Sequence, residues 1–288
     1  MELAPRIKTH MQIAAMESCT RSHRCVTRWS VLLNICVVSP HRDDACFSLG
    51  LSLVGWANAG HRIRVLNCFT RSAFAPFSDA ETVHPNDRTS YVSAMRERED
   101  KVFLRRIPGA DMMDLRLKDA PLRFRCEVDE VFRRPMSEAD PAIAKIRAAL
   151  EKRVGIDRAE VLFLPCGIGR HVDHITVREA AMPFGRPLAC GFYEDLPYAS
   201  REGAERELET LVEELGGRPG WALTPVVRQD DADAAARKRK LTEIYCSQVD
   251  ESSVEAMSRY AERYQGERIW ANERLADLLR SGVDGWLS

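Results

Sequence analysis

An almost uninterrupted apolar run spans residues 31–39 and ends at Pro40. A strand with one wet face alternates apolar and polar side chains, whereas a continuous run is typical of a strand buried on both faces of a parallel sheet. A helical pattern follows over residues 44–58, and Gly60 occupies the position that a C-capping glycine favours. This segment therefore predicts a β–α unit of an α/β fold.

The alternation of strands and helices continues along the chain. Further strands are expected at residues 63–69, 111–117, 161–165 and 188–193, and helices at 90–106, 142–153 and 174–182. Alternating elements form mostly parallel sheets, so we predict a Rossmann-like α/β fold, with a mostly parallel sheet and helices on both faces. The C-terminal portion is expected to be mainly helical, with helices at 201–215, 233–245 and 253–264 and a strand at 221–227.

Domain organisation is predicted to be simple. Residues 1–29 show no clear period and are expected to form an N-terminal arm that need not be fully ordered. Residues 30–288 are expected to form a single domain. Residues 75–88, rich in Pro, Ser, Asp and Asn, are predicted to form a long loop over the carboxyl ends of the strands, where open α/β sheets bind ligands.

Composition excludes several classes of function. The chain has 42 Lys and Arg against 43 Asp and Glu, which argues against a nucleic-acid-binding protein with a broad basic field. No stretch approaches the roughly 18–20 apolar residues of a membrane span, and residues 1–30 lack the apolar core of a signal peptide. Nine cysteines without a C-x-x-C pair, five of them in apolar runs, indicate reduced buried thiols. We therefore expect a cytoplasmic protein.

Two clusters of histidine and aspartate follow predicted strands. The first strand leads into His41-Arg42-Asp43-Asp44, and the strand at 161–165 leads into His171-Val172-Asp173-His174. The carboxyl ends of neighbouring strands share one edge of a sheet, so these side chains are expected to face one another. Two imidazoles and a carboxylate suit a catalytic zinc with an open coordination position, and another carboxylate can take a proton from water. The pattern predicts metal-assisted hydrolysis of an amide or ester.

Each cluster alone has a simpler interpretation. Asp43 or Asp44 alone is more often a helix N-cap, and H-x-D-H alone is a weak motif. The pair of clusters at matching strand ends is what favours a metal site. Glycine motifs for dinucleotides and the P-loop motif are absent from the sequence, which argues against a nucleotide-sugar-binding transferase.

The segments Pro40-His41-Arg42-Asp43-Asp44 and His171-Val172-Asp173-His174 resemble the two motifs of the PIG-L/LmbE-like zinc-dependent de-N-acetylases, over about residues 30–250. The resemblance implies a hydrolase that removes the N-acetyl group of an N-acetylglucosamine-type sugar or glycosylated small molecule. It implies one zinc per chain, with iron as the alternative, bound by His41, Asp44 and His174. Asp43 would be the general base, His171 would stabilise the oxyanion or act as an acid, and Asp173 would orient a histidine.

The chain departs from the family pattern around the substrate. Arg42 replaces a proline of the first motif, and its side chain is expected at the rim of the site or in solvent. Gly169 stands where some members carry a tyrosine, and residues 70–74 replace an acidic, glycine-rich stretch. Arg42 and Arg71 are the candidates for substrate binding, since an arginine can bind a hydroxyl or an anionic group.

Other functions and surfaces follow from the same residues. An amidase for a larger acyl group and a non-catalytic sugar-binding module are the alternatives, and a homo-oligomer is compatible with the sequence. The charged runs at 96–100 and 237–240 are expected to lie mostly on solvent-exposed helix faces. Trp56 is expected in the core, and Trp270 and Trp286 are expected to pack rather than bind sugar.

Overall fold

The computed structural model describes residues 32–229 and 233–280. The predicted arm at residues 1–29 and the prediction for Trp286 lie outside the described residues. Among the described residues, none of the helices combines the length and apolar character needed to cross a bilayer.

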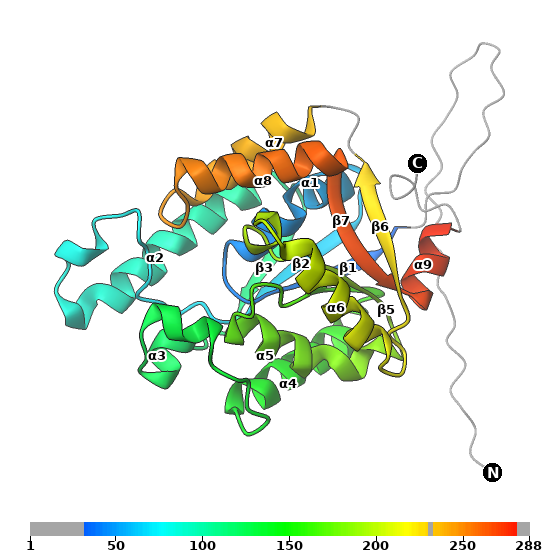
Figure 1. The fold of residues 1–288 in the computed structure, drawn as a ribbon, viewed down its shortest axis with the longest axis horizontal. Helices are drawn as coiled ribbons and strands as arrows, with labels where there is room; N and C mark the ends of the chain where they lie inside the picture. Colours follow the sequence, from blue (N-terminus) through cyan, green and yellow to red (C-terminus); the bar gives the residue numbers. More distant parts are fainter. Residues whose placement is uncertain (1–31, 230–232, 281–288) are drawn as a thin grey trace. The chain divides into compact units, whose positions relative to one another are not determined.

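The described residues contain seven strands in one sheet, in the order β3-β2-β1-β4-β5-β7-β6 (Figure 1). The five parallel strands of this part of the chain are β1 (Asn34–Ser39), β2 (Arg62–Asn67), β3 (Asp111–Asp114), β4 (Val161–Pro165) and β5 (Ala189–Tyr193). β1 lies between β2 and β4, and its last five residues are buried, as the apolar run predicts. The mostly parallel sheet is confirmed.

Helices cover both faces of the sheet (Figure 1). On one face lie α1 (Asp44–Asn58), α2 (Pro85–Leu104), α7 (Ala234–Thr242) and α8 (Glu251–Tyr264). On the other face lie α4 (Pro141–Ile156), α5 (Val172–Ala181) and α6 (Ala204–Gly216). The hydrophobic core under the first group of helices contains Trp56. This side chain is 1% exposed and stacks on Phe163, with ring centroids 4.9 Å apart. The predictions of helices on both faces and of a buried Trp56 are confirmed.

Short elements complete the chain between these helices and strands. They are α3 (Ala120–Phe124) and the 3-10 turns η1 (Ala80–Thr82), η2 (Val128–Phe132), η3 (Met182–Gly185), η4 (Tyr198–Ser200) and η5 (Glu243–Tyr245). The predicted loop at 75–88 is shorter than expected, because α2 begins at Pro85, where the His84 side chain accepts a hydrogen bond from the Asn86 amide.

The mainly helical C-terminal portion is confirmed, but it also contains a strand that the sequence pattern did not predict. β7 (Gly266–Asn272) inserts antiparallel between β5 and β6 (Leu223–Gln229), and α9 (Glu273–Arg280) follows it. The sequence pattern did not indicate β7, because the charged residue Glu267 interrupts its apolar residues. Glu267 is fully buried, and its carboxylate accepts a hydrogen bond from Lys238 Nζ at 2.6 Å. Lys238 is also fully buried, so the expectation of a solvent-exposed run at 237–240 is wrong at this residue.

The prediction of buried thiols is confirmed. Cys36, Cys46, Cys68, Cys166 and Cys190 are buried and free. Burial raises the pKa of the Cys36 thiol to about 12, so this thiol stays protonated and unreactive.

Candidate metal centre

The candidate site lies where β1 and β4 end side by side. β1 is followed by His41, and β4 leads through a short loop into α5, which carries His174. The ring centroid of His41 lies 5.3 Å from that of His174 and 4.9 Å from that of His171. The predicted convergence of the two motifs is confirmed.

His41, Asp44 and His174 each direct one potential ligand atom at a common point, with these atoms within 4.8 Å of one another. Asp44 Oδ2 lies 3.2 Å from His41 Nδ1 and 3.5 Å from His174 Nε2. His174 Nε2 is buried and has no hydrogen-bond partner among the described residues. A buried imidazole nitrogen without a partner, beside a carboxylate and a second imidazole, fits a zinc ion.

The turn after β1 holds Asp44 in place. Asp44 Oδ2 accepts from the His41 amide at 2.7 Å, and Ser39 Oγ accepts from the Ala45 amide at 3.0 Å. Asp43 occupies the N-cap position of α1, but its side chain makes no capping hydrogen bond. The simple N-cap interpretation is therefore wrong for Asp43, and its carboxylate is directed elsewhere.

Asp195 orients His174 from behind. Asp195 Oδ1 lies 2.6 Å from His174 Nδ1, and Oδ2 accepts from the amides of Gly167 and Ile168 at 2.6 and 3.0 Å. A carboxylate only accepts, so the ring proton sits on Nδ1 and the lone pair of Nε2 faces Asp44. The sequence interpretation missed Asp195. Its signal was its position just after β5, at the same edge of the sheet.

Asp173 contacts His41 in the way that Asp195 contacts His174. Asp173 Oδ2 lies 3.1 Å from His41 Nε2 and accepts from the Ala120 amide at 2.8 Å. Arg123 Nη1 forms an ion pair with the other carboxylate oxygen at 2.8 Å. His41, His171 and Asp173 form a second group with potential ligand atoms within 4.8 Å, but these contacts already occupy Asp173. The first group is therefore the better fit for a metal.

Electrostatics distinguish the three histidines. Burial alone would lower the pKa of His41, but the bonds to Asp173 and Asp44 outweigh it and raise that pKa to about 10. Burial would likewise lower the pKa of His174, and the charges of Asp44 and Asp195 raise it instead. Burial and the charge of His41 hold the pKa of His171 well below its usual value. His171 is therefore neutral at pH 7.

His171 has a defined tautomer. Its Nδ1 accepts from the Asp173 amide at 3.1 Å, so the neutral ring carries its proton on Nε2. Nε2–H is then a hydrogen-bond donor for a group in the site.

A buried arginine of α2 pairs with Asp43. Arg96 Nη2 donates to Asp43 Oδ1 at 2.7 Å, and Arg96 is 5% exposed. Glu99 and Asp100 are buried as well. The expectation that residues 96–100 lie mostly on the solvent side of α2 is therefore wrong, because this helix face makes polar contacts with residues around the site.

The predicted orientation of Arg42 is also wrong. Arg42 is 6% exposed, and its guanidinium pairs with Asp100 at 2.5 Å and with Asp114. These contacts join the end of β1 to α2 and β3, so we do not assign Arg42 to substrate binding. Arg71 is exposed on the loop after β2.

Two aromatic rings flank the histidines. The Phe132 ring lies edge-on to His171 at 5.3 Å, and the Tyr198 ring lies edge-on to His174 at 5.8 Å. Gly169 has φ +80°, and a Cβ at this position would lie 2.7 Å from Tyr198 Cγ. Glycine at 169 thus gives Tyr198 its space. No local sequence pattern indicated this pair, since the rings come from separate turns, η2 and η4.

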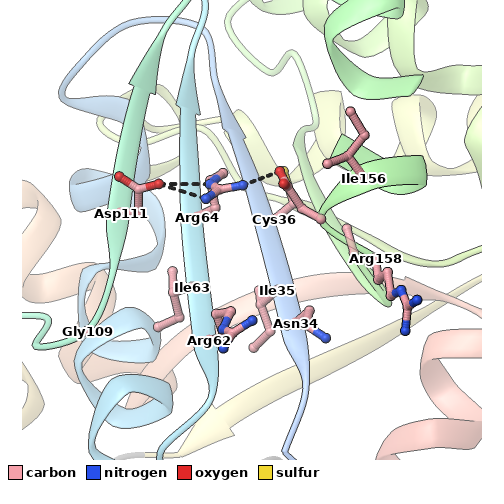
Figure 2. Close-up of a pocket in the computed structure, with 12 residues that line it drawn as sticks. Asn34, Ile35, Cys36, Arg62, Ile63, Arg64, Gly109, Asp111, Ile156 and Arg158 are labelled. Atoms are coloured by element: carbon pink, nitrogen blue, oxygen red, sulfur yellow. Dashed lines mark hydrogen bonds and ion pairs between the residues drawn. The ribbon is translucent and has the colours of Figure 1, made fainter. Parts of the chain in front are cut away.

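A hollow of about 550 Å³ lies at the other end of the strands, along the first residues of β1 and β2 (Figure 2). Arg64 lies between Asp111 and Asp157 and forms ion pairs with both. Asp157 also pairs with Arg153 Nη1 at 2.6 Å, so both carboxylates have arginine partners, and no histidine lines the hollow. It therefore lacks the features of a metal centre.

Comparisons with known proteins agree with this geometry. The profile of the family described as PIG-L, GlcNAc-PI de-N-acetylase, matches residues 36–184. A 2'-N-acetylparomamine deacetylase of Streptomyces fradiae is 32% identical over 231 residues, which cover 79% of this chain and 77% of that protein. A 2'-N-acetylparomamine deacetylase of Niallia circulans is 27% identical over 185 residues, which cover 56% of this chain and 66% of that protein.

Solved structures share the fold. The A40926 pseudoaglycone deacetylase Dbv21 superposes with a TM-score of 0.59 at 23% identity, covering 84% of this chain and 97% of that one. The zinc-inhibited form of the teicoplanin deacetylase Orf2 gives a TM-score of 0.58 at 20% identity, covering 83% and 97%.

Proposed function

The chain belongs to the PIG-L (GlcNAc-PI de-N-acetylase) family, whose members hydrolyse amides, and from this premise we propose that it is a zinc-dependent de-N-acetylase of an N-acetylglucosamine-type sugar on a small glycosylated molecule. The observation that carries the proposal is the buried Nε2 of His174, which lies beside Asp44 and His41 and has no hydrogen-bond partner within residues 32–229 and 233–280. The names of the two relatives, both deacetylases of 2'-N-acetylparomamine, support an amino-sugar substrate.

The residues around this point divide the work of amide hydrolysis. A zinc ion held by His41, Asp44 and His174 would polarise the acetyl carbonyl and make water more acidic. Asp43 takes a proton from the attacking water and hands it to the leaving amine. His171 donates its Nε2–H to the oxygen that becomes negative.

The surroundings of the site fit a sugar. Phe132 and Tyr198 lie beside the histidines, and the apolar face of a sugar can pack on an aromatic ring. Arg71, exposed after β2, is our candidate for a hydroxyl or an anionic group of the substrate. The buried free thiols fit a reducing compartment, so we place the enzyme in the cytoplasm.

The test measures acetate released from a panel of N-acetylated amino sugars, with matched N-butyryl and N-hexanoyl sugars, by purified protein of known metal content. We expect about one zinc per chain and preference for acetyl. Asp43→Ala should keep the metal and lose about 10²–10⁴ in kcat, the usual contribution of a general base. His174→Ala should lose metal and turnover together.

Three results would contradict the proposal in different ways. Protein that binds no metal even with added zinc would refute the metal centre. Faster hydrolysis of the longer acyl groups would favour the amidase alternative. Metal binding and sugar binding without any hydrolysis would favour a binding module, which the presence of Asp43 and His171 argues against.

A further inference from the structure

Two consecutive aspartates follow β1 at the candidate site, yet their surroundings differ. Asp44 Oδ2 faces two imidazoles, at 3.2 and 3.5 Å. Asp43 Oδ1 instead accepts from Arg96 Nη2 at 2.7 Å. The side chains are chemically identical and adjacent in the chain, so their neighbours must decide which one binds the metal and which one acts as the base.

We propose that Arg96 is a positioning residue that holds the Asp43 carboxylate away from the metal, so that Asp44 alone of the pair is a ligand and Asp43 stays available as the base. The inference rests on the proposed function and deepens it. Arg96 lies outside both sequence motifs, on α2, 53 residues after Asp43.

The fold fixes Arg96 with its own contacts. Glu99, one turn along α2, accepts from the amide and from Oγ of Ser247, both at 2.9 Å. Asp100 accepts from the Tyr245 hydroxyl at 2.8 Å. Residues three and four apart share a helix face, so these bonds attach the face that carries Arg96 to the segment behind the site. These contacts therefore hold in place the helix face from which Arg96 reaches Asp43.

The pair is selective as well as buried. Within the part of the chain that the structure describes, the ion pair of Arg96 is with Asp43 alone. Burying a guanidinium is unfavourable unless a partner offsets the lost hydration, and Asp43 is that partner. Arg98, two residues along the same helix, is exposed instead.

A catalytic zinc site needs three protein ligands and one open position. Without Arg96, the Asp43 carboxylate could bind the metal as a fourth protein ligand and exclude water. The guanidinium supplies the hydrogen bond and the positive charge that Asp43 would otherwise find at the metal.

The experiment compares Arg96→Gln with Arg98→Gln, which makes the same change at an exposed position of the same helix. Each protein is loaded with cobalt(II), and its metal content, visible absorption spectrum, kcat and KM are measured. We expect Arg96→Gln to bind one cobalt per chain with an altered spectrum, to lose about 10²-fold or more in kcat, and to keep KM within about twofold. Arg98→Gln should match the wild type, and Arg96→Lys should recover part of kcat.

A double variant tests whether Arg96 acts through Asp43. Arg96→Gln in an Asp43→Ala background should cause no further loss of kcat and no further change in the spectrum. Additive losses would overturn the proposal, as would an Arg96→Gln protein with a wild-type spectrum and kcat.

Other outcomes remain decisive. Loss of cobalt from Arg96→Gln would overturn the proposal too, because Arg96 would then build the metal site itself. If Arg96→Gln does not fold, Arg96→Lys gives the comparison with a smaller expected loss of kcat, because lysine keeps the charge but not the planar fork. If wild-type protein releases no acetate from any sugar, the proposed function fails, and the cobalt spectra still decide the role of Arg96.

Discussion

Replacing Asp195 with asparagine should weaken metal binding while the fold persists. The Asp195 carboxylate makes three contacts: His174 Nδ1 at 2.6 Å and the amides of Gly167 and Ile168 at 2.6 and 3.0 Å. Asparagine has nearly the same shape, but only one of its two terminal atoms can accept a hydrogen bond. It therefore cannot satisfy both sides of the contact.

The two orientations of the asparagine differ in cost. If its oxygen serves the two amides, its NH2 faces His174 Nδ1, and the ring proton must move to Nε2, the atom that faces the metal. If it turns over, two buried amides lose their acceptor, at about 1–3 kcal/mol each. The first orientation loses fewer hydrogen bonds and should prevail. Removing a carboxylate behind a histidine ligand typically costs 10–100-fold in metal affinity, or about 1.4–2.8 kcal/mol.

The assay is a competition titration of zinc against a chromophoric chelator, with thermal unfolding of the metal-free proteins alongside. Glu194→Gln is the matched control, because Glu194 is a buried neighbour whose contacts are with Tyr260, Arg268 and Trp270. We expect weaker zinc binding for Asp195→Asn and unchanged zinc binding for Glu194→Gln. Equal zinc affinity in Asp195→Asn and wild type would refute the tautomer argument, and equal losses in both variants would show that any buried charge nearby matters.

Three further predictions concern the stability of the fold. Lys238→Met leaves Glu267 buried without its cation, so the free energy of unfolding in urea should fall by about 3–5 kcal/mol, and Lys238→Met with Glu267→Gln should recover part of it. Gly169→Ala should lower the midpoint of thermal unfolding through its positive φ and its clash with Tyr198, and adding Tyr198→Ala should relieve the clash; additive effects would contradict this reasoning. Burial lowers the pKa of His61, so the unfolded chain takes up this proton first as pH falls below about 6.5. Wild-type stability should therefore decline toward pH 5 more steeply than that of His61→Gln, and parallel pH curves would argue against it.

The fold was predictable wherever sequence pattern and burial coincide. The bounds of α1 and β4 agree with the expected ranges, because continuous apolar runs and a C-terminal glycine mark them. β7 was missed because its buried Glu267 interrupts the apolar pattern. The lysine that compensates this carboxylate lies 29 residues away along the chain, where no local pattern connects the two.

The site was predictable to the extent that its residues are adjacent in sequence. His41, Asp44 and His174 lie in two short motifs at strand ends, and the order of β1 and β4 brings them together. Asp195 comes from the loop after another strand, 21 residues after His174, and Arg96 comes from a helix. Contacts at such separations depend on packing, which the sequence alone does not show.

The wrong predictions about charged residues share one cause, which also bears on where a metal would bind. A cation on a helix is exposed by default, because burial costs its hydration. Around this edge of the sheet the cost is offset, because several aspartates gather there. Arg96 pairs with Asp43, Arg123 pairs with Asp173, and two backbone amides bind Asp195. Asp44 accepts from the His41 amide as well, but unlike the other three carboxylates it also faces two imidazoles, at 3.2 and 3.5 Å. A divalent cation should therefore bind at Asp44, and the buried cations around it select that position as much as the ligands do.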